Sequence, residues 1–176
     1  MKKVAVFGKP GGGKSTFSKN LSVATGIPLY QLDKIEYLTG GEKVAENIYL
    51  QKHNEILKSE AWIIDGLGTI ATFRERLSEA DTLIYIDLPL RVHYWWVTKR
   101  LFKSPLFKPE GWPDKSPMIQ STITSWVNLR NSPKLWTPEF SKKLAGMSEY
   151  KSVYHISSVK ELKNFIDNFI NRKTSS

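Results

Sequence analysis

A glycine-rich break between a predicted strand and a predicted helix is the feature that most restricts this chain. Residues 4–7 (VAVF) form a short continuous apolar run, the pattern of a strand that is covered on both faces. They lead into GKPGGGKS at 8–15, after which apolar residues recur at helical spacing up to residue 24. A chain that crosses from strand to helix through three consecutive glycines can use backbone conformations that other residues avoid. The sequence therefore predicts a strand–loop–helix unit with a specialised loop.

The loop matches the pattern G-x-x-x-x-G-K-[ST]. Glycines allow close backbone approach, so consecutive amides can point into one anion-sized hollow, and the following helix adds its positive dipole end. We expect Lys14 to reach the β- and γ-phosphates of ATP and the Ser15 hydroxyl to bind Mg²⁺. Pro10 has no amide and is expected to cost the cradle one donor. The alternative is a glycine-rich turn with a lysine by chance. The predicted nucleotide-binding residues are Gly8, Pro10, Gly11, Gly12, Gly13, Lys14, Ser15 and Thr16.

Strand-like and helix-like patterns alternate along the rest of the chain, which predicts an α/β fold with a parallel sheet and helices on both faces. Ligands of such sheets bind beyond the carboxyl ends of the strands, and Asp33, Asp65 and Asp87 are expected there, beside the glycine loop. Further strands are predicted at 28–33, 61–66, 82–89 and 152–157. Helices are predicted at 15–24, 42–59, 71–77, 90–102 and 118–129, and after a capping box at Ser158–Glu161.

Length and composition indicate one globular domain, residues 1–176, with 40% hydrophobic residues. The chain has no cysteine, which excludes disulfides and thiolate metal sites. No apolar run approaches the roughly 18 residues that a membrane span needs, and the basic start is followed by too short an apolar stretch for a signal peptide. We therefore expect a cytoplasmic protein with no membrane partner.

Positive charge is concentrated in one part of the chain. Between residues 91 and 143, ten Lys and Arg stand against three Asp and Glu, an excess of seven out of the net charge of +9. The same part contains a proline- and tryptophan-rich stretch within 101–135. A local basic excess predicts an anionic partner, which can be a phosphate or a nucleic acid.

With these motifs in order along nearly the whole chain, the sequence resembles the adenylate-kinase-like branch of the P-loop NTPases. More narrowly, it is similar to bacterial DNA topology modulation (adenylate-kinase-related) proteins. The resemblance implies a three-layer α/β/α fold, a five-stranded parallel sheet with the third strand next to the glycine-loop strand, and a basic lid-like insert at 101–135. The stretches that carry it, besides the glycine loop and the insert, are LYQLDKI, WIIDG, LIYIDLP and VYHISSVKEL.

The resemblance also assigns roles to residues outside the loop. Asp65 takes the place of the acid that holds Mg²⁺ through water; its alternative is a helix cap or turn aspartate. Arg100 and Arg130 take the place of lid arginines that neutralise the moving phosphate; their alternative is surface charge. Trp96 stands where the pattern has another arginine. Asp87 is left between a site role and a cap of the next helix.

The acceptor side departs from adenylate kinases. Their third strand is followed by an arginine that grips AMP, but here GLGT stands at 66–69. Asp33 instead resembles the acid that nucleoside and sugar-like kinases place near an acceptor hydroxyl, where it can orient the hydroxyl and take its proton. The alternative for Asp33 is an ordinary turn acid.

Two functions follow from these patterns. The leading one is a small-molecule kinase that transfers the γ-phosphoryl group of MgATP to a hydroxyl or phosphate acceptor, with Lys14, Asp33, Arg100 and Arg130 as catalytic residues. The alternative is a nucleotide-dependent regulator that binds nucleic acid. The histidines do not cluster: His53 is expected on a solvated or half-buried helix face, His93 in packing, and His155 within a strand.

Overall fold

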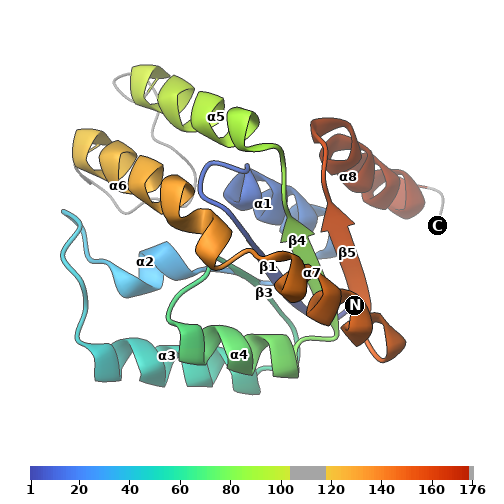
Figure 1. Cartoon of the computed structure of the whole chain (residues 1–176). Helices are drawn as coiled ribbons and strands as arrows, with labels where there is room; N and C mark the ends of the chain where they lie inside the picture. Colours follow the sequence, from blue (N-terminus) through green and yellow to red (C-terminus); the bar gives the residue numbers. More distant parts are fainter. Residues whose placement is uncertain (104–117, 175–176) are drawn as a thin grey trace.

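A computed structural model of the chain describes residues 1–103 and 118–174, and their arrangement is shown in Figure 1. Five strands form one parallel sheet in the order β2-β3-β1-β4-β5, so the third strand lies beside the first, as the resemblance implies. Residues 104–117 of the expected insert lie outside the described residues. The strands are β1 (Lys3–Gly8), β2 (Leu29–Gln31), β3 (Trp62–Asp65), β4 (Thr82–Ile86) and β5 (Ser152–Ile156).

Helices cover both faces of the sheet, which confirms the predicted three-layer α/β/α class of P-loop NTPases. Alternate residues of β1 show the division: Val4 and Val6 pack with α1 and α8, and Ala5 and Phe7 pack with α3, α4 and α7. In the described chain the helices are α1 (Lys14–Thr25), α2 (Leu32–Glu36), α3 (Glu46–Lys58), α4 (Ile70–Glu79), α5 (Leu90–Lys103), α6 (Met118–Asn131), α7 (Pro138–Gly146) and α8 (Val159–Thr174). Short 3₁₀ turns lie at Ser132–Lys134 and Met147–Glu149.

Three expectations about the elements were wrong. The strand expected at 28–33 ends at Gln31, and Asp33 lies in the first turn of α2. The helix expected at 42–59 begins at Glu46 and buries Tyr49 and His53, so His53 is a core residue that is 0% exposed. Tertiary packing sets this face, because Tyr49 contacts Thr72 of α4. Helix α7 was not predicted, although Thr137 caps it through the amide of Phe140.

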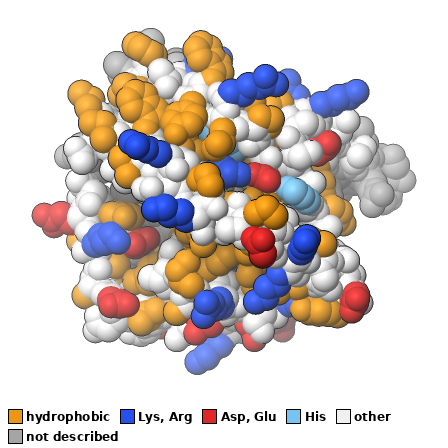
Figure 2. Space-filling model, viewed as in Figure 1, with side chains coloured by type: hydrophobic (Ala, Val, Ile, Leu, Met, Phe, Trp, Pro, Cys, Tyr) orange, Lys and Arg blue, Asp and Glu red, His pale blue; other side chains and the backbone are white. Residues whose placement is uncertain are grey.

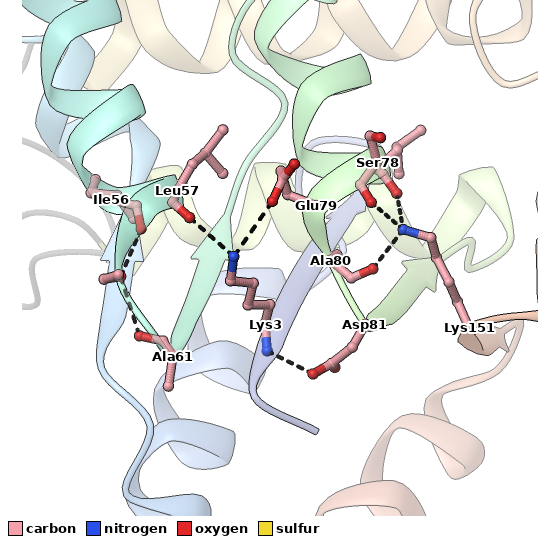
Figure 3. A network of polar contacts seen from close by, with 11 residues as sticks. Lys3, Ile56, Leu57, Ala61, Ser78, Glu79, Ala80, Asp81 and Lys151 are labelled. Carbon is pink, nitrogen blue, oxygen red and sulfur yellow. Dashed lines mark hydrogen bonds and ion pairs between the residues drawn. The ribbon is translucent and has the colours of Figure 1, made fainter.

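The amino-terminal edge of the sheet is closed by a network of polar contacts, shown in Figure 3. The Asp81 carboxylate accepts the backbone amides of Lys2 and Lys3 at 2.7 and 3.0 Å. The Lys3 ammonium donates to the carbonyl of Leu57 at the end of α3. The Lys151 ammonium donates to three carbonyls at the end of α4, those of Leu77, Ser78 and Ala80. These contacts satisfy helix ends whose carbonyls have no partner within the helix.

Helices α5 and α6 lie side by side over the carboxyl edge of the sheet (Figure 1). Figure 2 shows apolar side chains gathered on their outer face. Trp95 and Phe102 of α5 are 62% and 76% exposed, and Ile119 of α6 is 69% exposed. None of the helices in the described ranges combines the length and the apolar character that crossing a membrane requires.

Candidate functional site

The glycine loop has no room for side chains at its glycine positions. Gly13 is the N-cap of α1 with φ 76°, a left-handed conformation, and no side chain caps this helix. A Cβ atom at Gly8 would lie 2.1 Å from the carbonyl oxygen of Ile86 on β4. In the described residues, the amides of Gly11, Gly12 and Gly13 donate to no protein group. The loop and helix end therefore present unpaired amides, which fits a phosphate chain.

A cavity of about 1010 Å³ opens above the loop. The loop, the ends of β1 and β3, helix α2 and the facing sides of α5 and α6 line it. All the predicted site residues except Arg130 lie on its wall: Gly8, Pro10, Gly11, Gly12, Gly13, Lys14, Ser15, Thr16, Asp33, Asp65 and Arg100. Arg130 is an exposed residue of α6 that is not on the cavity wall, where its neighbours Asn128 and Asn131 lie instead. The structure thus brings eleven of the twelve residues together.

Lys14 lies at the centre of the charged groups. Its ammonium donates to the carbonyl oxygen of Lys9 at 2.8 Å, within the glycine loop. Burial lowers the pKa of Lys14, and the carboxylates of Asp65 and Asp33 oppose this change. A lysine ammonium that is buried despite its desolvation penalty is typical of a site that binds an anion.

Asp33 is open to the solvent of the cavity, although protein surrounds it on its other sides. This burial, together with the nearby charge of Asp65, raises the pKa of Asp33 to about 6, and Lys14 opposes the rise. A carboxyl group with a raised pKa is a better proton acceptor for a hydroxyl than an ordinary surface aspartate. The position in the first turn of α2, rather than at a strand end, is what directs Asp33 into the cavity wall.

Asp65 and Ser15 supply the oxygen atoms that suit Mg²⁺. Asp65 ends β3, is 4% exposed, and pairs in register with Val6 of β1, two residues before the glycine loop. The Ser15 hydroxyl is in the first turn of α1 on the cavity wall. In residues 1–103 and 118–174, no cluster of three or more His, Asp or Glu could hold a metal by itself. Mg²⁺ in such sites takes most of its ligands from phosphates and water.

Arg100 connects the two helices over the cavity. It projects from α5, and its guanidinium donates to the Ser125 hydroxyl of α6 at 3.4 Å. Burial lowers the pKa of Arg100 to about 10, and the Asp33 carboxylate opposes this. Arg100 therefore remains charged at neutral pH and lies within electrostatic reach of Asp33.

Asp87 holds the other side of the glycine loop. Its carboxylate forms ion pairs with Lys9, which is 8% exposed, and with His155 of β5 at 3.3 Å. Burial alone would raise the pKa of Asp87, but the Lys9 ammonium and His155 lower it overall. Asp87 is thus a partner of the loop and of β5. Neither Lys9 nor His155 was predicted to take part.

The loop after β3 has a built-in support that the sequence did not indicate. Arg76 of α4 is 1% exposed and donates to the carbonyl of Leu67. A Cβ atom at Gly68 would lie 2.3 Å from the Tyr49 hydroxyl, so this loop packs closely on α3. Arg74 is exposed and Arg76 is buried beneath the loop, and neither lines the cavity. This agrees with the sequence GLGT at 66–69, which has no arginine where adenylate kinases carry one for AMP.

Comparisons with known proteins bear on the fold. No model of a protein family and no curated protein matches the sequence. A similar solved structure is the shikimate kinase from Acinetobacter baumannii in complex with shikimate, with a TM-score of 0.59 and 18% identity over 99% of this chain and 94% of that one. Another is an unliganded sugar kinase from a Janibacter species, with a TM-score of 0.49 and 16% identity over 99% and 93% of the two chains. The likeness to the shikimate kinase shows that the chain shares its α/β fold, which is that of the P-loop NTPases, and the resemblance to the topology modulation proteins stays a prediction.

Proposed function

We propose that this chain is a small-molecule kinase that transfers the γ-phosphoryl group of MgATP to a hydroxyl group. The observation that carries the proposal is that Lys14 and Asp33, a phosphate-binding cation and a carboxyl group with a raised pKa, open into the same cavity. The fold likeness to a shikimate kinase is consistent with a phosphotransferase. Because that likeness is one of fold, the proposal depends on the site.

Each part of the cavity has a role in this proposal. The amides of the glycine loop and the first turn of α1 bind the phosphate chain, and Lys14 leaves the Lys9 carbonyl to neutralise it. Ser15 and Asp65 hold Mg²⁺, directly and through water. When bound, MgATP supplies the phosphoryl group and a metal that neutralises its charge. Arg100 stabilises the negative charge on the opposite side.

Asp33 acts on the acceptor. It accepts the hydroxyl proton as that oxygen forms its bond to the γ-phosphorus, and ADP leaves with the electrons of the broken P–O bond. The pKa of about 6 keeps Asp33 ionised at neutral pH, so it is available as a base. The cavity above it leaves room for the acceptor.

The acceptor side favours an uncharged, hydroxylated molecule such as a nucleoside or a sugar. The described wall near Asp33 carries a second carboxylate, Glu36, and the amides of Asn128 and Asn131. Carboxylates and amides bind hydroxyl groups well, and a carboxylate repels an acceptor phosphate. No arginine from α4 reaches the described wall, so the grip that adenylate kinases use on AMP is missing there.

The nucleic-acid alternative was based on the basic segment between residues 91 and 143. Two of its charges, Lys99 and Arg100, lie on the cavity wall, where they can serve a nucleotide. The alternative stays a prediction from composition.

The proposal is tested by incubating the purified protein with MgATP and a panel of nucleosides, sugars and nucleoside monophosphates, and measuring ADP together with the phosphorylated product. We expect product from a hydroxyl acceptor and none from the same reactions with the Asp33→Asn variant. Tight ATP binding with no product across the panel would contradict the kinase proposal. Phosphorylation of a monophosphate on its phosphate group would contradict the hydroxyl assignment.

A further inference from the structure

One face of α5 packs directly against the glycine loop. His93, Trp96 and Val97 are spaced at i, i+3 and i+4, so they share one side of the helix. A Cβ atom at Gly11 would lie 2.4 Å from Val97, one at Gly12 would lie 2.8 Å from the His93 ring, and one at Gly13 would lie 2.9 Å from Trp96. The loop glycines therefore permit this contact as well as the approach of a phosphate.

His93 makes the polar contact within this packing. It is 0% exposed, and its Nδ1 lies 2.8 Å from the carbonyl oxygen of Pro10. Since a carbonyl only accepts, Nδ1 carries the hydrogen in this bond. Nε2 is buried and has no hydrogen-bond partner among residues 1–103 and 118–174, which suits an unprotonated nitrogen. Burial lowers the pKa of His93 to about 4, and Lys14 and Lys9 lower it further while Asp87 and the Pro10 carbonyl oppose them. His93 is thus neutral, with its proton on Nδ1.

The geometry of the peptide bond extends this contact to the ligand. In a trans peptide the carbonyl and the amide of the next residue point in opposite directions, and the structure has no cis peptide in its described residues. A Pro10 carbonyl held toward His93 directs the amide of Gly11 away from the His93 ring. Gly11 lies on the wall of the cavity.

We infer that His93 is a positioning residue for phosphate binding: it fixes the Pro10–Gly11 peptide so that the Gly11 amide donates to a phosphate oxygen of the nucleotide. The inference rests on the nucleotide-binding half of the proposed function and is independent of the acceptor. It predicts that His93 contributes to binding through the loop, although it does not touch the ligand.

The preceding peptide has the opposite arrangement. The Lys9 carbonyl accepts from the Lys14 ammonium, so an amide on residue 10 would point away from Lys14. Pro10 has no such amide, and the cradle therefore loses no donor on the side of Lys14. In this part of the loop, the Lys9 carbonyl thus accepts from the Lys14 ammonium, and the Pro10 carbonyl accepts from His93.

Three variants test the inference. His93→Leu removes the donor and keeps an apolar side chain, whereas His93→Asn places an amide N–H near the position of Nδ1. His53→Leu is the matched control, because His53 is equally buried at 0% exposed but lies on α3, off the cavity wall. Calorimetry with MgATP and with inorganic tripolyphosphate measures binding without turnover, and thermal unfolding of each variant measures stability.

We expect His93→Leu to weaken the binding of both ligands about tenfold, which corresponds to ~1.4 kcal/mol. We expect His93→Asn to stay within about threefold of the wild type, because one hydrogen bond to the carbonyl is restored. His53→Leu should change neither binding constant, because His53 lies off the cavity wall. Equal losses for the Leu and Asn variants, or an equal loss for His53→Leu, would overturn the inference.

A nuclear magnetic resonance measurement on the wild-type protein needs no variant. Nitrogen-15 spectra of the imidazole should show His93 protonated on Nδ1, and titration with tripolyphosphate should shift the Gly11 amide strongly. A proton on Nε2, an unshifted Gly11 amide, or no binding of tripolyphosphate would each contradict the role of His93. Binding of ATP with the expected shifts but without phosphotransfer would contradict only the kinase proposal.

Discussion

The amino-terminal and carboxyl edges of the sheet differ in how far their polar groups find partners within the protein. At the amino-terminal edge, Asp81 and Lys151 are matched to backbone amides and carbonyls (Figure 3). At the carboxyl edge, helix α1 begins without a side-chain cap, and burial shifts the pKa values of Lys14 and Asp33 against their charged forms. One edge is arranged for stability, and the other keeps donors and charges that only a ligand can satisfy.

Helix starts within the carboxyl edge also differ in their capping. Thr69, Thr137 and Ser158 cap α4, α7 and α8 through their side chains. Gly13 begins α1 with no such cap. A glycine in place of such a cap costs only a few tenths of a kcal/mol, and here the uncapped start lies on the cavity wall. Because α2 and α3 also begin without a side-chain cap, the open start of α1 marks the site only together with the glycine loop and the cavity.

The largest expected effect comes from removing the central cation of the carboxyl edge. Lys14→Ala should lower kcat/KM for ATP by at least about 10³-fold, because the charge that neutralises the phosphates is lost. Its midpoint of unfolding should not fall, since burial already lowers the pKa of Lys14 and the folded state gains little from this ammonium. Steady-state kinetics and thermal unfolding check the two halves. A variant that retains activity, or that loses it only through unfolding, would contradict the site.

Asp33→Asn should lower kcat by about 10²- to 10³-fold because the proton acceptor is gone. The folded-state pKa of about 6 lies above the ordinary value of 3.8, so ionised Asp33 destabilises the folded protein once the pH passes through this interval. The variant should therefore unfold at a higher temperature than the wild type at pH 8, and at the same temperature near pH 3. For the wild type, kcat/KM should fall as the pH drops below about 6.

Asp81→Asn is the matched control at the other edge. Burial would raise the pKa of Asp81, but hydrogen bonds from Thr82, Lys3 and Lys2 outweigh it and lower the pKa. This carboxylate therefore stabilises the fold above its ordinary pKa, and the contribution is lost as the pH falls. Asp81→Asn should lower the midpoint of unfolding at pH 7 and leave kcat unchanged. The same sign of stability change in both variants would break the comparison of the two edges.

A smaller effect, on stability alone, is expected for Lys151→Met. Its ammonium donates to the carbonyls of Leu77, Ser78 and Ala80, and hydrogen bonds from a charged group typically contribute about 1.5–3 kcal/mol. Burial lowers the pKa of Lys151 and offsets part of this gain, and the side chain is partly exposed, so we expect a loss of at most about 1 kcal/mol, or ~2–4 °C in the midpoint of unfolding. Kinetic constants for ATP should not change. A change in KM for ATP would show that the two edges are coupled.

The smallest effect is expected for Asp87→Asn, at the rim between the loop and β5. Loss of the ion pair with Lys9 should raise KM for ATP about two- to fivefold and lower stability by about 1 kcal/mol at pH 7. Since the folded-state pKa of Asp87 is lowered from 3.8, the stability difference should decrease as the pH falls below 3.8 and vanish below the folded-state pKa. Urea unfolding at pH 7 and pH 3 measures it. A difference as large at pH 3 as at pH 7 would indicate another cause.

The sequence predicted the parts of the site whose signals are local. Glycine spacing and an adjacent Lys and Ser define the loop, and an acid after an apolar run placed Asp65 at the end of β3. Arg130 shows the limit of this reasoning, because the turn of α6 directs Asn128 and Asn131, and not Arg130, to the cavity. His53 shows another limit, since it was expected on a solvated or half-buried face and is buried; burial depends on which helix face meets the core.

By itself, the sequence determined the α/β class, the phosphate-binding loop and the acids at the carboxyl edge, because each depends on residues that are neighbours in the chain. Only the tertiary structure decided that His93 holds Pro10, that Asp87 pairs with Lys9 and that Arg76 supports the loop after β3. The first two contacts join residues 83 and 78 positions apart, and the third joins α4 to a loop residue nine positions earlier. Their formation depends on packing geometry, which no spacing pattern encodes.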